Sequence, residues 1–217
     1  MSLTKVHTVY KVGNKRIPSV TTILGVLGGS KDALIHWAWK LGCEGQDYKA
    51  VRDGAASVGT LAHAMILAHL KKETVDTSDY SADFIDLAEN SFLSYLQWEK
   101  QHEVQPIIVE KPLVSEQYFF GGTPDLYCKL DGMYTLVDFK TGKSIHKEHT
   151  YQVAAYGILI EENDPTFVAD YRILRIGKDA NDAWDEMVVS TKSIELKREI
   201  FKKCLEVYAL LREDNRD

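Results

Sequence analysis

The sequence is poor in cysteine and has no long apolar run. Cys43, Cys128 and Cys204 are its thiols, and no two of them have the CxxC spacing typical of zinc, iron–sulfur or redox sites. We therefore expect reduced cysteines and no Fe–S cluster. The apolar stretches are shorter than the roughly 18 residues that a membrane-spanning helix needs. The first residues also lack the apolar segment of a secretory signal, so the sequence predicts a cytoplasmic protein with no membrane partner.

Positive charge is also scarce. The 217 residues include 26 Lys and Arg against 32 Asp and Glu, which gives a formal net charge of −6. This balance argues against a broad phosphate-binding surface, but it leaves room for a narrow basic groove or a metal-bridged phosphate. No repeat, low-complexity tract or linker rich in proline and serine divides the chain. We expect a single domain over residues 1–217.

The hydrophobic pattern changes from helical to strand-like near residue 104. Before that point we expect a hairpin at His7–Pro18, a short helix that Ser19 or Thr21 caps and that ends near Gly28-Gly29, and helices at Lys31–Leu41, Gln46–Leu70 (with a break near Gly54 or Gly59) and Ser81–His102. After it we expect strands at Ile107–Leu113, Gly122–Leu130 and Met133–Lys140, a helix at His146–Glu161, strands at Phe167–Ile176 and Trp184–Val189, and an amphipathic helix at Ser193–Arg212 with Leu211 on its apolar face. The β-β-β-α-β order predicts an α/β core at 105–217 that follows a hairpin and a helical lobe at 1–104.

A tight turn joins two of the expected strands. Asp131-Gly132 is typical of a two-residue type I′ hairpin turn, in which the residues on either side of the turn pair with each other. Counting outward along both strands brings Asp125 opposite Asp138, and the period of two puts Lys140 on the same face as Asp138. The other paired positions are largely apolar, so we expect this hairpin in the interior.

Two carboxylates that face each other across a strand pair need a neutralising charge. Their Cβ atoms lie about 5 Å apart, and like charges at that distance are destabilising, the more so in the low dielectric of an interior. A shared proton, a salt bridge or a divalent cation would relieve the repulsion. Lys140 alone would make the group a structural Asp–Lys cluster. Mg²⁺ or Mn²⁺ would use the same carboxylates beside a substrate phosphate.

Four short motifs occur in one order along the chain. They are Gly59-Thr-Leu-Ala-His63, Pro124-Asp125, Asp138-Phe139-Lys140 and Gln152-Val-Ala-Ala-Tyr156. Together they resemble the motifs of the PD-(D/E)XK nuclease superfamily, in its RecB-like exonuclease branch. The resemblance spans residues 59–156. It implies a restriction-endonuclease-like core, in which a mixed central sheet is flanked by helices, and the cysteines do not match the Fe–S variety of this branch.

The resemblance also implies roles for the motif residues. His63, Asp125 and Asp138 would bind one or two Mg²⁺ or Mn²⁺ ions, with the backbone carbonyl of Phe139 as a further ligand. Lys140 would orient the attacking water and stabilise charge on the phosphate. Taken by itself, His63 is more typical of a partly buried structural histidine than of a metal ligand.

Further residues are candidates with weaker support. Gln152 and Tyr156, four apart on one helix face, would support the lysine or contact the DNA backbone. Glu110 resembles an additional acidic site residue of some family members, but a solvated strand charge is an equal alternative. Ser19 and Thr21 resemble a segment that could receive a strand-end phosphate, although helix capping explains them too.

The function that the resemblance implies is a metal-dependent deoxyribonuclease. We expect an exonuclease that hydrolyses phosphodiester bonds from DNA ends, with single-stranded DNA favoured, in recombination or repair. Its partners would be DNA and a recombinase or helicase, in the cytoplasm of a bacterium or phage-infected host. Three alternatives stay open: a structure- or sequence-specific endonuclease, a non-catalytic nucleic-acid-binding or recombination accessory module on the same fold, and a hydrolase of another phosphoester.

Overall fold

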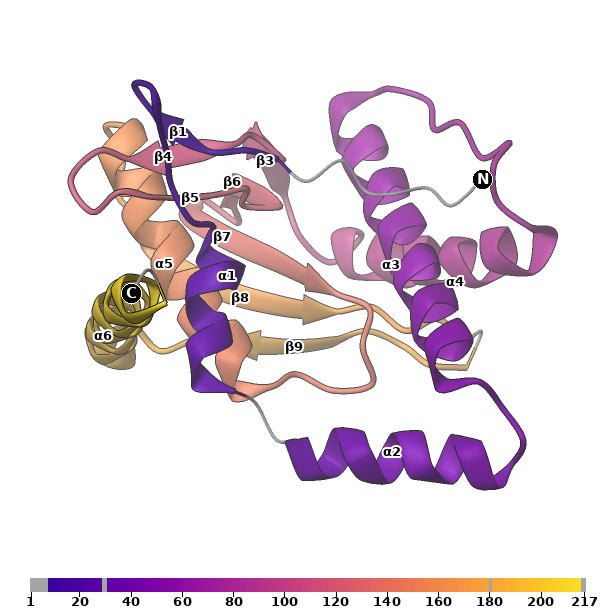
Figure 1. Ribbon diagram of the computed structural model, residues 1–217. Helices are drawn as coiled ribbons and strands as arrows, with labels where there is room; N and C mark the ends of the chain where they lie inside the picture. Colours follow the sequence, from indigo (N-terminus) through magenta and orange to yellow (C-terminus); the bar gives the residue numbers. More distant parts are fainter. Residues whose placement is uncertain (1–7, 29–30, 180, 216–217) are drawn as a thin grey trace.

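A mixed five-stranded sheet forms the centre of the computed structural model, which describes residues 8–28, 31–179 and 181–215. In sheet order the strands are β3 (Val104–Val109), β6 (Leu126–Leu130), β7 (Met133–Lys140), β8 (Asp170–Arg175) and β9 (Asp185–Val188). β7 and β8 are parallel, and the other neighbours are antiparallel. The predicted fold class, a mixed central sheet flanked by helices in β-β-β-α-β order, is confirmed (Figure 1). His7 and Gly29, at the ends of two predicted elements, lie outside the described residues.

Helices cover both faces of the sheet (Figure 1). On one side α5 (Lys147–Asn163), which connects β7 to β8, packs against α1 (Val20–Leu24) and α6 (Thr191–Asp214), and on the other α3 (Tyr48–Lys71) packs against α4 (Ala82–Glu99). Successive side chains of a strand point to opposite faces, so β7 contributes to both sides. Leu136 packs in the cluster with α5, whereas Val137 and Phe139 pack with Tyr95 and Trp98 of α4.

The hairpin of β6 and β7 has the predicted register. The two strands pair residue for residue around a two-residue turn. Asp131 and Gly132 in that turn have φ values of 48° and 87°, as a type I′ turn requires. Extended one residue beyond Leu126, the register brings Asp125 opposite Asp138.

The N-terminal segment packs beside α5 and α6. It consists of β1 (Lys11–Val12), β2 (Lys15–Arg16), α1 and a 3₁₀ turn (η1, Gly25–Leu27), and it docks on a small hairpin of β4 (Leu113–Ser115) and β5 (Phe120–Gly122). Gly121 N donates a hydrogen bond to Pro18 O (2.9 Å). A Cβ on Gly121 would lie 2.3 Å from Tyr10 Cγ, so only glycine permits this approach of the two segments.

α3 is continuous, contrary to the predicted break near Gly54 or Gly59. Glycine inside a helix costs only about 1 kcal/mol relative to alanine. Packing of α3 along α4 supplies compensating stabilisation, because helices in proteins depend more on tertiary contacts than on propensity. The helix begins after Asp47, whose carboxylate accepts a hydrogen bond from Lys49 N (2.9 Å).

Two of the predicted strands are divided in the structure. The strand expected at Ile107–Leu113 is split between β3 and β4, because Glu110 has a φ of 49° that turns the chain. The strand expected at Gly122–Leu130 is split between β5 and β6, because Pro124 has no backbone N–H to donate to a ladder. The small β4–β5 hairpin is therefore an element that was not predicted.

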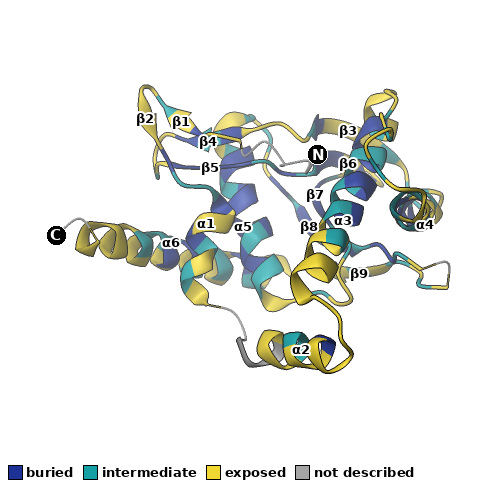
Figure 2. Ribbon diagram, turned by 45° about the vertical axis from the view of Figure 1, so that its right-hand side comes forward, coloured by how far each residue is buried: buried dark blue, intermediate teal, exposed yellow. Residues whose placement is uncertain are grey.

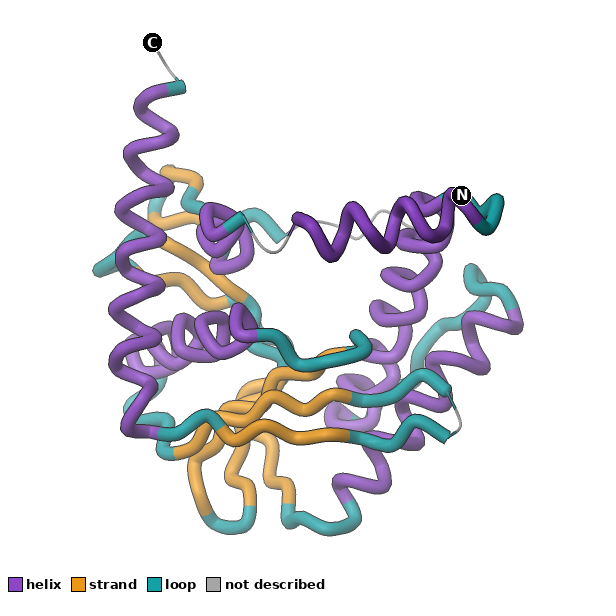
Figure 3. Tube along the Cα trace, turned by 90° about the horizontal axis from the view of Figure 1, so that it is seen from below, coloured by secondary structure: helices purple, strands orange, loops and turns teal. Residues whose placement is uncertain are grey.

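Two helices present apolar side chains to solvent. On α2 (Lys31–Cys43), Leu34, Ile35 and Trp39 are each at least 60% exposed (Figure 2). Leu211, predicted on the apolar face of α6, is 49% exposed, because the C-terminal part of α6 extends past the body of the molecule (Figure 3). Within the described ranges, no helix combines the length and apolarity that crossing a membrane requires.

The attachment of α6 to the core can be tested at Phe201. This side chain is fully buried, with its ring centroid 4.8 Å from that of Phe120. We expect Phe201→Ala to lower the free energy of unfolding by about 3–5 kcal/mol, because it opens a cavity in the core. Leu196→Ala, at a 65% exposed position of the same helix, should change it by no more than about 0.5 kcal/mol. Urea unfolding followed by circular dichroism measures both values, and equal decreases would contradict this packing of α6.

Candidate active site

Asp125 and Asp138 lie side by side at the end of the β6–β7 hairpin that is remote from its turn. The Asp138 side chain, on β7, is 1% exposed, and the Asp125 side chain, just before β6, is 16% exposed. Asp125 Oδ2 accepts a hydrogen bond from the N–H of Phe139 (2.8 Å), the residue after Asp138. The predicted juxtaposition of the two carboxylates is therefore present in the structure.

Lys140 supplies a positive charge next to this pair. Its Nζ lies 2.5 Å from Asp138 Oδ2, in an ion pair that buries the carboxylate almost completely. Burial raises the pKa of Asp138 to about 6; Lys140 opposes the rise and Asp125 adds to it. Burial would also raise the pKa of Asp125, but His63 and Lys140 hold it below its ordinary value. Burial would lower the pKa of Lys140, yet the two carboxylates raise it, so the ammonium stays charged.

His63 reaches the carboxylates from α3. Its Nδ1 is 3.6 Å from Asp125 Oδ1, and its ring meets the ring of Phe139 edge-on, with centroids 6.1 Å apart. One helical turn earlier, Gly59 contacts the end of β7: a Cβ there would lie 2.6 Å from Thr141 Oγ1. Residues four apart share a helix face. The Gly-x-x-x-His spacing thus combines a close helix–strand contact with an imidazole beside Asp125.

Gln152 and Tyr156 lie one turn apart on α5 and line the same cavity. Gln152 Nε2 donates a hydrogen bond to Tyr156 Oη (2.9 Å), which leaves the hydroxyl hydrogen of Tyr156 free for another acceptor. Burial and the neighbouring Asp138 raise the pKa of Tyr156 well above its ordinary value, so the hydroxyl stays protonated. Gly122 makes room for the ring, since a Cβ there would lie 2.7 Å from Tyr156 Cε1.

Glu110 follows β3 and contributes a partly exposed carboxylate. Its N–H donates to the carbonyl of Asp125 (3.0 Å), and its φ of 49° is uncommon for a residue other than glycine. Its side chain is 47% exposed, with Oε2 3.7 Å from Lys71 Nζ. Glu110 is thus tied by its backbone to Asp125 and by its side chain to the end of α3.

Ser19 and Thr21 belong to the cap of α1. Ser19 Oγ accepts a hydrogen bond from Thr22 N (3.1 Å) and shares hydrogen bonds with Thr21 Oγ1 (3.0 Å) and Thr22 Oγ1 (2.8 Å). The predicted capping by Ser19 is confirmed. Both side chains also line the cavity that contains the carboxylates.

One cavity of about 490 Å³ brings together every side chain predicted for the site, namely Ser19, Thr21, His63, Glu110, Asp125, Asp138, Lys140, Gln152 and Tyr156. The Phe139 carbonyl is directed to the same side as its N–H, because both groups of a strand residue face the same neighbour. The cavity is also lined by residues that were not predicted for the site, namely Thr8, Tyr10, Thr60, Ala64 and Thr123. Thr60 lies three residues before His63, so the helical period could have predicted it, whereas Tyr10, whose hydroxyl is hydrogen-bonded to Thr123 Oγ1 (2.7 Å), has no local sequence signal.

The donor set suits a hard divalent cation. Asp138 contributes a buried carboxylate, and Asp125 and His63 add a second carboxylate and an imidazole, which are ligand types of Mg²⁺ and Mn²⁺. Across the described ranges, no three His, Cys, Asp or Glu side chains already form a group that could hold an ion. In this arrangement Lys140 supplies positive charge that a bound cation would otherwise supply to the carboxylates.

Comparison with known proteins finds distant structural likenesses. No family model and no curated protein matches the chain. Among solved structures, a presumed exonuclease from Eubacterium rectale is 12% identical, with 70% of this chain and 68% of that chain covered and a TM-score of 0.47. An alkaline exonuclease from Laribacter hongkongensis is 12% identical, with 75% and 90% covered and a TM-score of 0.37, and its complex with dAMP is 13% identical, with 75% and 96% covered and a TM-score of 0.34. These values are too low to transfer the chemistry of those proteins to this chain.

The contact of Gly59 with Thr141 predicts a specific double-variant result. Gly59→Ala should lower the free energy of unfolding by about 1–3 kcal/mol, because the new methyl group overlaps Thr141 Oγ1. Adding Thr141→Ala removes Oγ1 and leaves Thr141 Cβ 3.8 Å away, an ordinary contact, so the double variant should recover most of the stability. Gly42→Ala, in open space on α2, should be neutral or stabilising by up to about 1 kcal/mol. Denaturant titrations measure all three, and additive destabilisation in the double variant would refute the contact.

Proposed function

We propose that the chain is a metal-dependent deoxyribonuclease that hydrolyses phosphodiester bonds from DNA ends. The observation that carries this proposal is the convergence of Asp125, Asp138 and Lys140 in one cavity, with the Asp138 side chain only 1% exposed. Burying adjacent carboxylates costs stability through desolvation and mutual repulsion. Titratable groups whose pKa values are shifted by burial and by neighbouring charges, inside a cleft, are typical of functional sites.

A divalent cation belongs to this proposal. His63, Asp125, Asp138 and the carbonyl of Phe139 would hold it, and we expect Mn²⁺ or Mg²⁺ because the set combines oxygen ligands with one imidazole. Such an ion, when bound, polarises a phosphoryl oxygen and lowers the pKa of a water molecule. Asp125 and Asp138 would bind the ion with their carboxylates. The imidazole of His63, on α3, would complete the ligand set.

The chain's own donors would act on the phosphate and the attacking water. Lys140 keeps its proton and lies next to Asp138, so its ammonium would orient the water and stabilise negative charge on the phosphate. The Tyr156 hydroxyl, which is neutral and has its hydrogen free, would donate to a phosphate oxygen. Gln152 would act as a positioning residue, because its amide holds the Tyr156 oxygen.

The depth of the site favours a flexible strand with a free end. Asp138 is almost inaccessible in the cavity, which α3 and the N-terminal segment also line, so a scissile phosphate must enter a deep recess. A single strand can bend its backbone into such a recess more readily than a duplex, whose phosphates lie on a stiff helix. We therefore propose single-stranded DNA ends as the preferred substrate. A setting in recombination or repair, with a recombinase or helicase as partner, stays the expectation from the motif resemblance.

Substitution of the central residues tests the proposal. Asp138→Asn or Lys140→Ala should reduce release of acid-soluble nucleotides from labelled single-stranded DNA in Mn²⁺ by about 10²–10³-fold or more, because each removes a group that acts on the reacting phosphate. Circular dichroism should show that both variants stay folded. Substrates labelled at one end and then at the other give the direction of degradation.

Matched controls separate catalysis from a general loss of charge. Asp185→Asn on β9 and Lys129→Ala on β6 make the same chemical changes at exposed positions of the same sheet and should keep wild-type rates. The proposal fails if the wild-type chain, in Mn²⁺, leaves single-stranded, duplex and nicked DNA all intact. Cleavage confined to internal positions would instead favour the endonuclease alternative.

Metal binding can be tested without turnover. At a Mn²⁺ concentration 100 times its Kd, a ligand specific to the folded state stabilises it by about 2.7 kcal/mol. For a chain of this size that corresponds to a rise in Tm of about 5–10 °C. We expect the rise in the wild type and in Asp185→Asn, and its absence in Asp138→Asn. A wild type that does not respond, or an equal response in Asp138→Asn, would show that Asp138 is not a ligand.

A further inference from the structure

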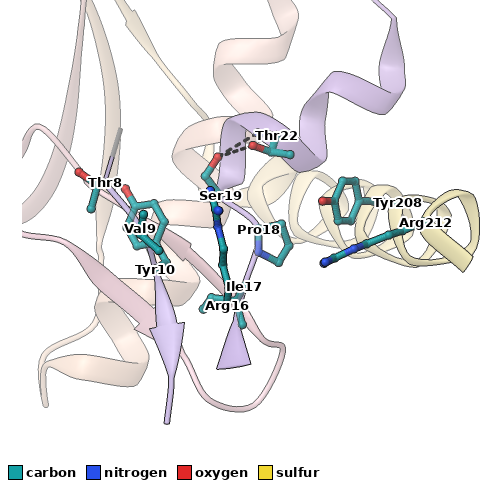
Figure 4. Close-up of a pocket in the computed structure, with 10 residues that line it drawn as sticks. All are labelled: Thr8, Val9, Tyr10, Arg16, Ile17, Pro18, Ser19, Thr22, Tyr208 and Arg212. Atoms are coloured by element: carbon teal, nitrogen blue, oxygen red, sulfur yellow. Dashed lines mark hydrogen bonds between the residues drawn. The ribbon is translucent and has the colours of Figure 1, made fainter. Parts of the chain in front are cut away.

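A second cavity, of about 470 Å³, adjoins the candidate active site. It lies between the N-terminal hairpin, the start of α1 and the C-terminal part of α6 (Figure 4). Its lining residues are Thr8, Val9, Tyr10, Arg16, Ile17, Pro18, Ser19, Thr22, Tyr208 and Arg212. Thr8, Tyr10 and Ser19 also line the cavity of the carboxylates, so the two cavities share a wall.

The two cavities carry opposite charges. Glu110, Asp125 and Asp138 line the first, whereas the charged side chains of the second are Arg16 and Arg212, with no carboxylate among its lining residues. In a chain with a net charge of −6, this concentration of positive charge is local. Positive charge concentrated in a cavity favours the binding of an anion.

Within the described ranges, neither guanidinium group forms an ion pair. The ion pairs of arginine in the described part of the chain use other arginines: Arg52, Arg172, Arg175 and Arg198. Figure 4 shows the Arg16 side chain extending from β2 toward Ser19 and the Arg212 side chain reaching from α6 toward Pro18. The hydroxyl of Tyr208 faces the same space. The donors thus approach from both ends of the described chain.

We propose that this second cavity binds a phosphate of the nucleic acid strand whose reactive phosphodiester lies in the first cavity, an inference that rests on the proposed function. A guanidinium group can donate two parallel, charge-assisted hydrogen bonds to the oxygens of one phosphate. Arg16 and Arg212 supply them, and Tyr208 adds a neutral donor. Ser19, on the shared wall, marks where the strand passes from one cavity to the other.

A strand fits this arrangement better than a separate small anion. A strand held at the carboxylates must leave that cavity along some path, and its next phosphates need positive partners. The joined cavity provides them, and the lining of the first cavity has one lysine and one histidine against three carboxylates. The bound phosphate is either the terminal phosphate of the strand or an internal one, and substrates with different ends distinguish these sources.

Arg16→Gln and Arg212→Gln test the inference by binding. We would measure the Kd of a fluorescent oligodeoxythymidylate in EDTA by anisotropy, so that no cleavage occurs. Each substitution should weaken binding by about tenfold, because a charge-assisted hydrogen bond is worth roughly 1.5–3 kcal/mol and 1.4 kcal/mol is tenfold. The plot of log Kd against log salt should become shallower by about 0.7 for each phosphate that no longer meets a guanidinium group.

Two further variants control for charge alone. Lys11→Gln removes a positive charge from the same hairpin as Arg16, and Lys203→Gln removes one from the same helix as Arg212, both outside the cavity. Their effect on Kd should stay within about twofold, since salt screens exposed charges at a distance. The side chains of Arg16 and Arg212 are exposed, so all four variants should fold.

The ends of the strand identify the phosphate. If a terminal phosphate binds, the wild type prefers strands that carry it at one end, and both arginine variants abolish the preference. If an internal phosphate binds, the arginine substitutions weaken binding equally for strands with and without a terminal phosphate. They have no effect on binding of a dinucleotide, which is too short to reach both cavities. Either result supports the inference.

The inference is overturned if the arginine variants bind as the wild type does, if the lysine controls weaken binding as much, or if the wild type does not bind the strand. A separate measurement of nucleotide release by the wild type in Mn²⁺ distinguishes failure of this inference from failure of the proposed nuclease function. Intact release with arginine-independent binding would reject the second cavity alone. Arginine-dependent binding without release would reject the nuclease and keep the cavity as a phosphate site.

Discussion

The candidate site depends on the burial of the Asp138 carboxylate beside that of Asp125. A charged oxygen in an interior is tolerated only where partners offset its lost hydration. Lys140, two residues along the same strand, and His63, on a helix that Gly59 brings close to β7, are those partners. They compensate in part, because the pKa of Asp138 is still raised to about 6. In the proposed function a divalent cation completes the compensation.

Short-range geometry explains how much of this arrangement the sequence could predict. A two-residue turn defines the pairing of its strands, so Asp131-Gly132 was enough to bring Asp125 opposite Asp138, and the strand period put Lys140 beside them. The helical period similarly joins Gln152 to Tyr156. That these groups share one cavity with His63 followed from the motif resemblance, and the structure agrees on their positions. Their chemical roles stay predictions.

Long-range contacts and backbone turns explain what was missed. Tyr10 meets Thr123 across 113 residues, and no local pattern indicates such a partner. The left-handed conformation of Glu110 is unusual for its residue type, so the division of the strand there had no sequence signal. The break expected in α3 was wrong because a propensity of about 1 kcal/mol does not outweigh packing along a whole helix. Pro124, by contrast, was a usable signal for the end of a strand.

Different helices and strands line the two cavities, and this affects how the fold can diversify. The carboxylates, lysine and imidazole stand on the sheet and on α3, whereas the walls unique to the neighbouring cavity belong to the N-terminal hairpin, α1 and α6. Grafting a different hairpin and terminal helix onto the same sheet would therefore alter which ligands are accepted while leaving the reactive groups in place. The two sets of residues would then vary separately, except at Thr8, Tyr10 and Ser19, which line both cavities.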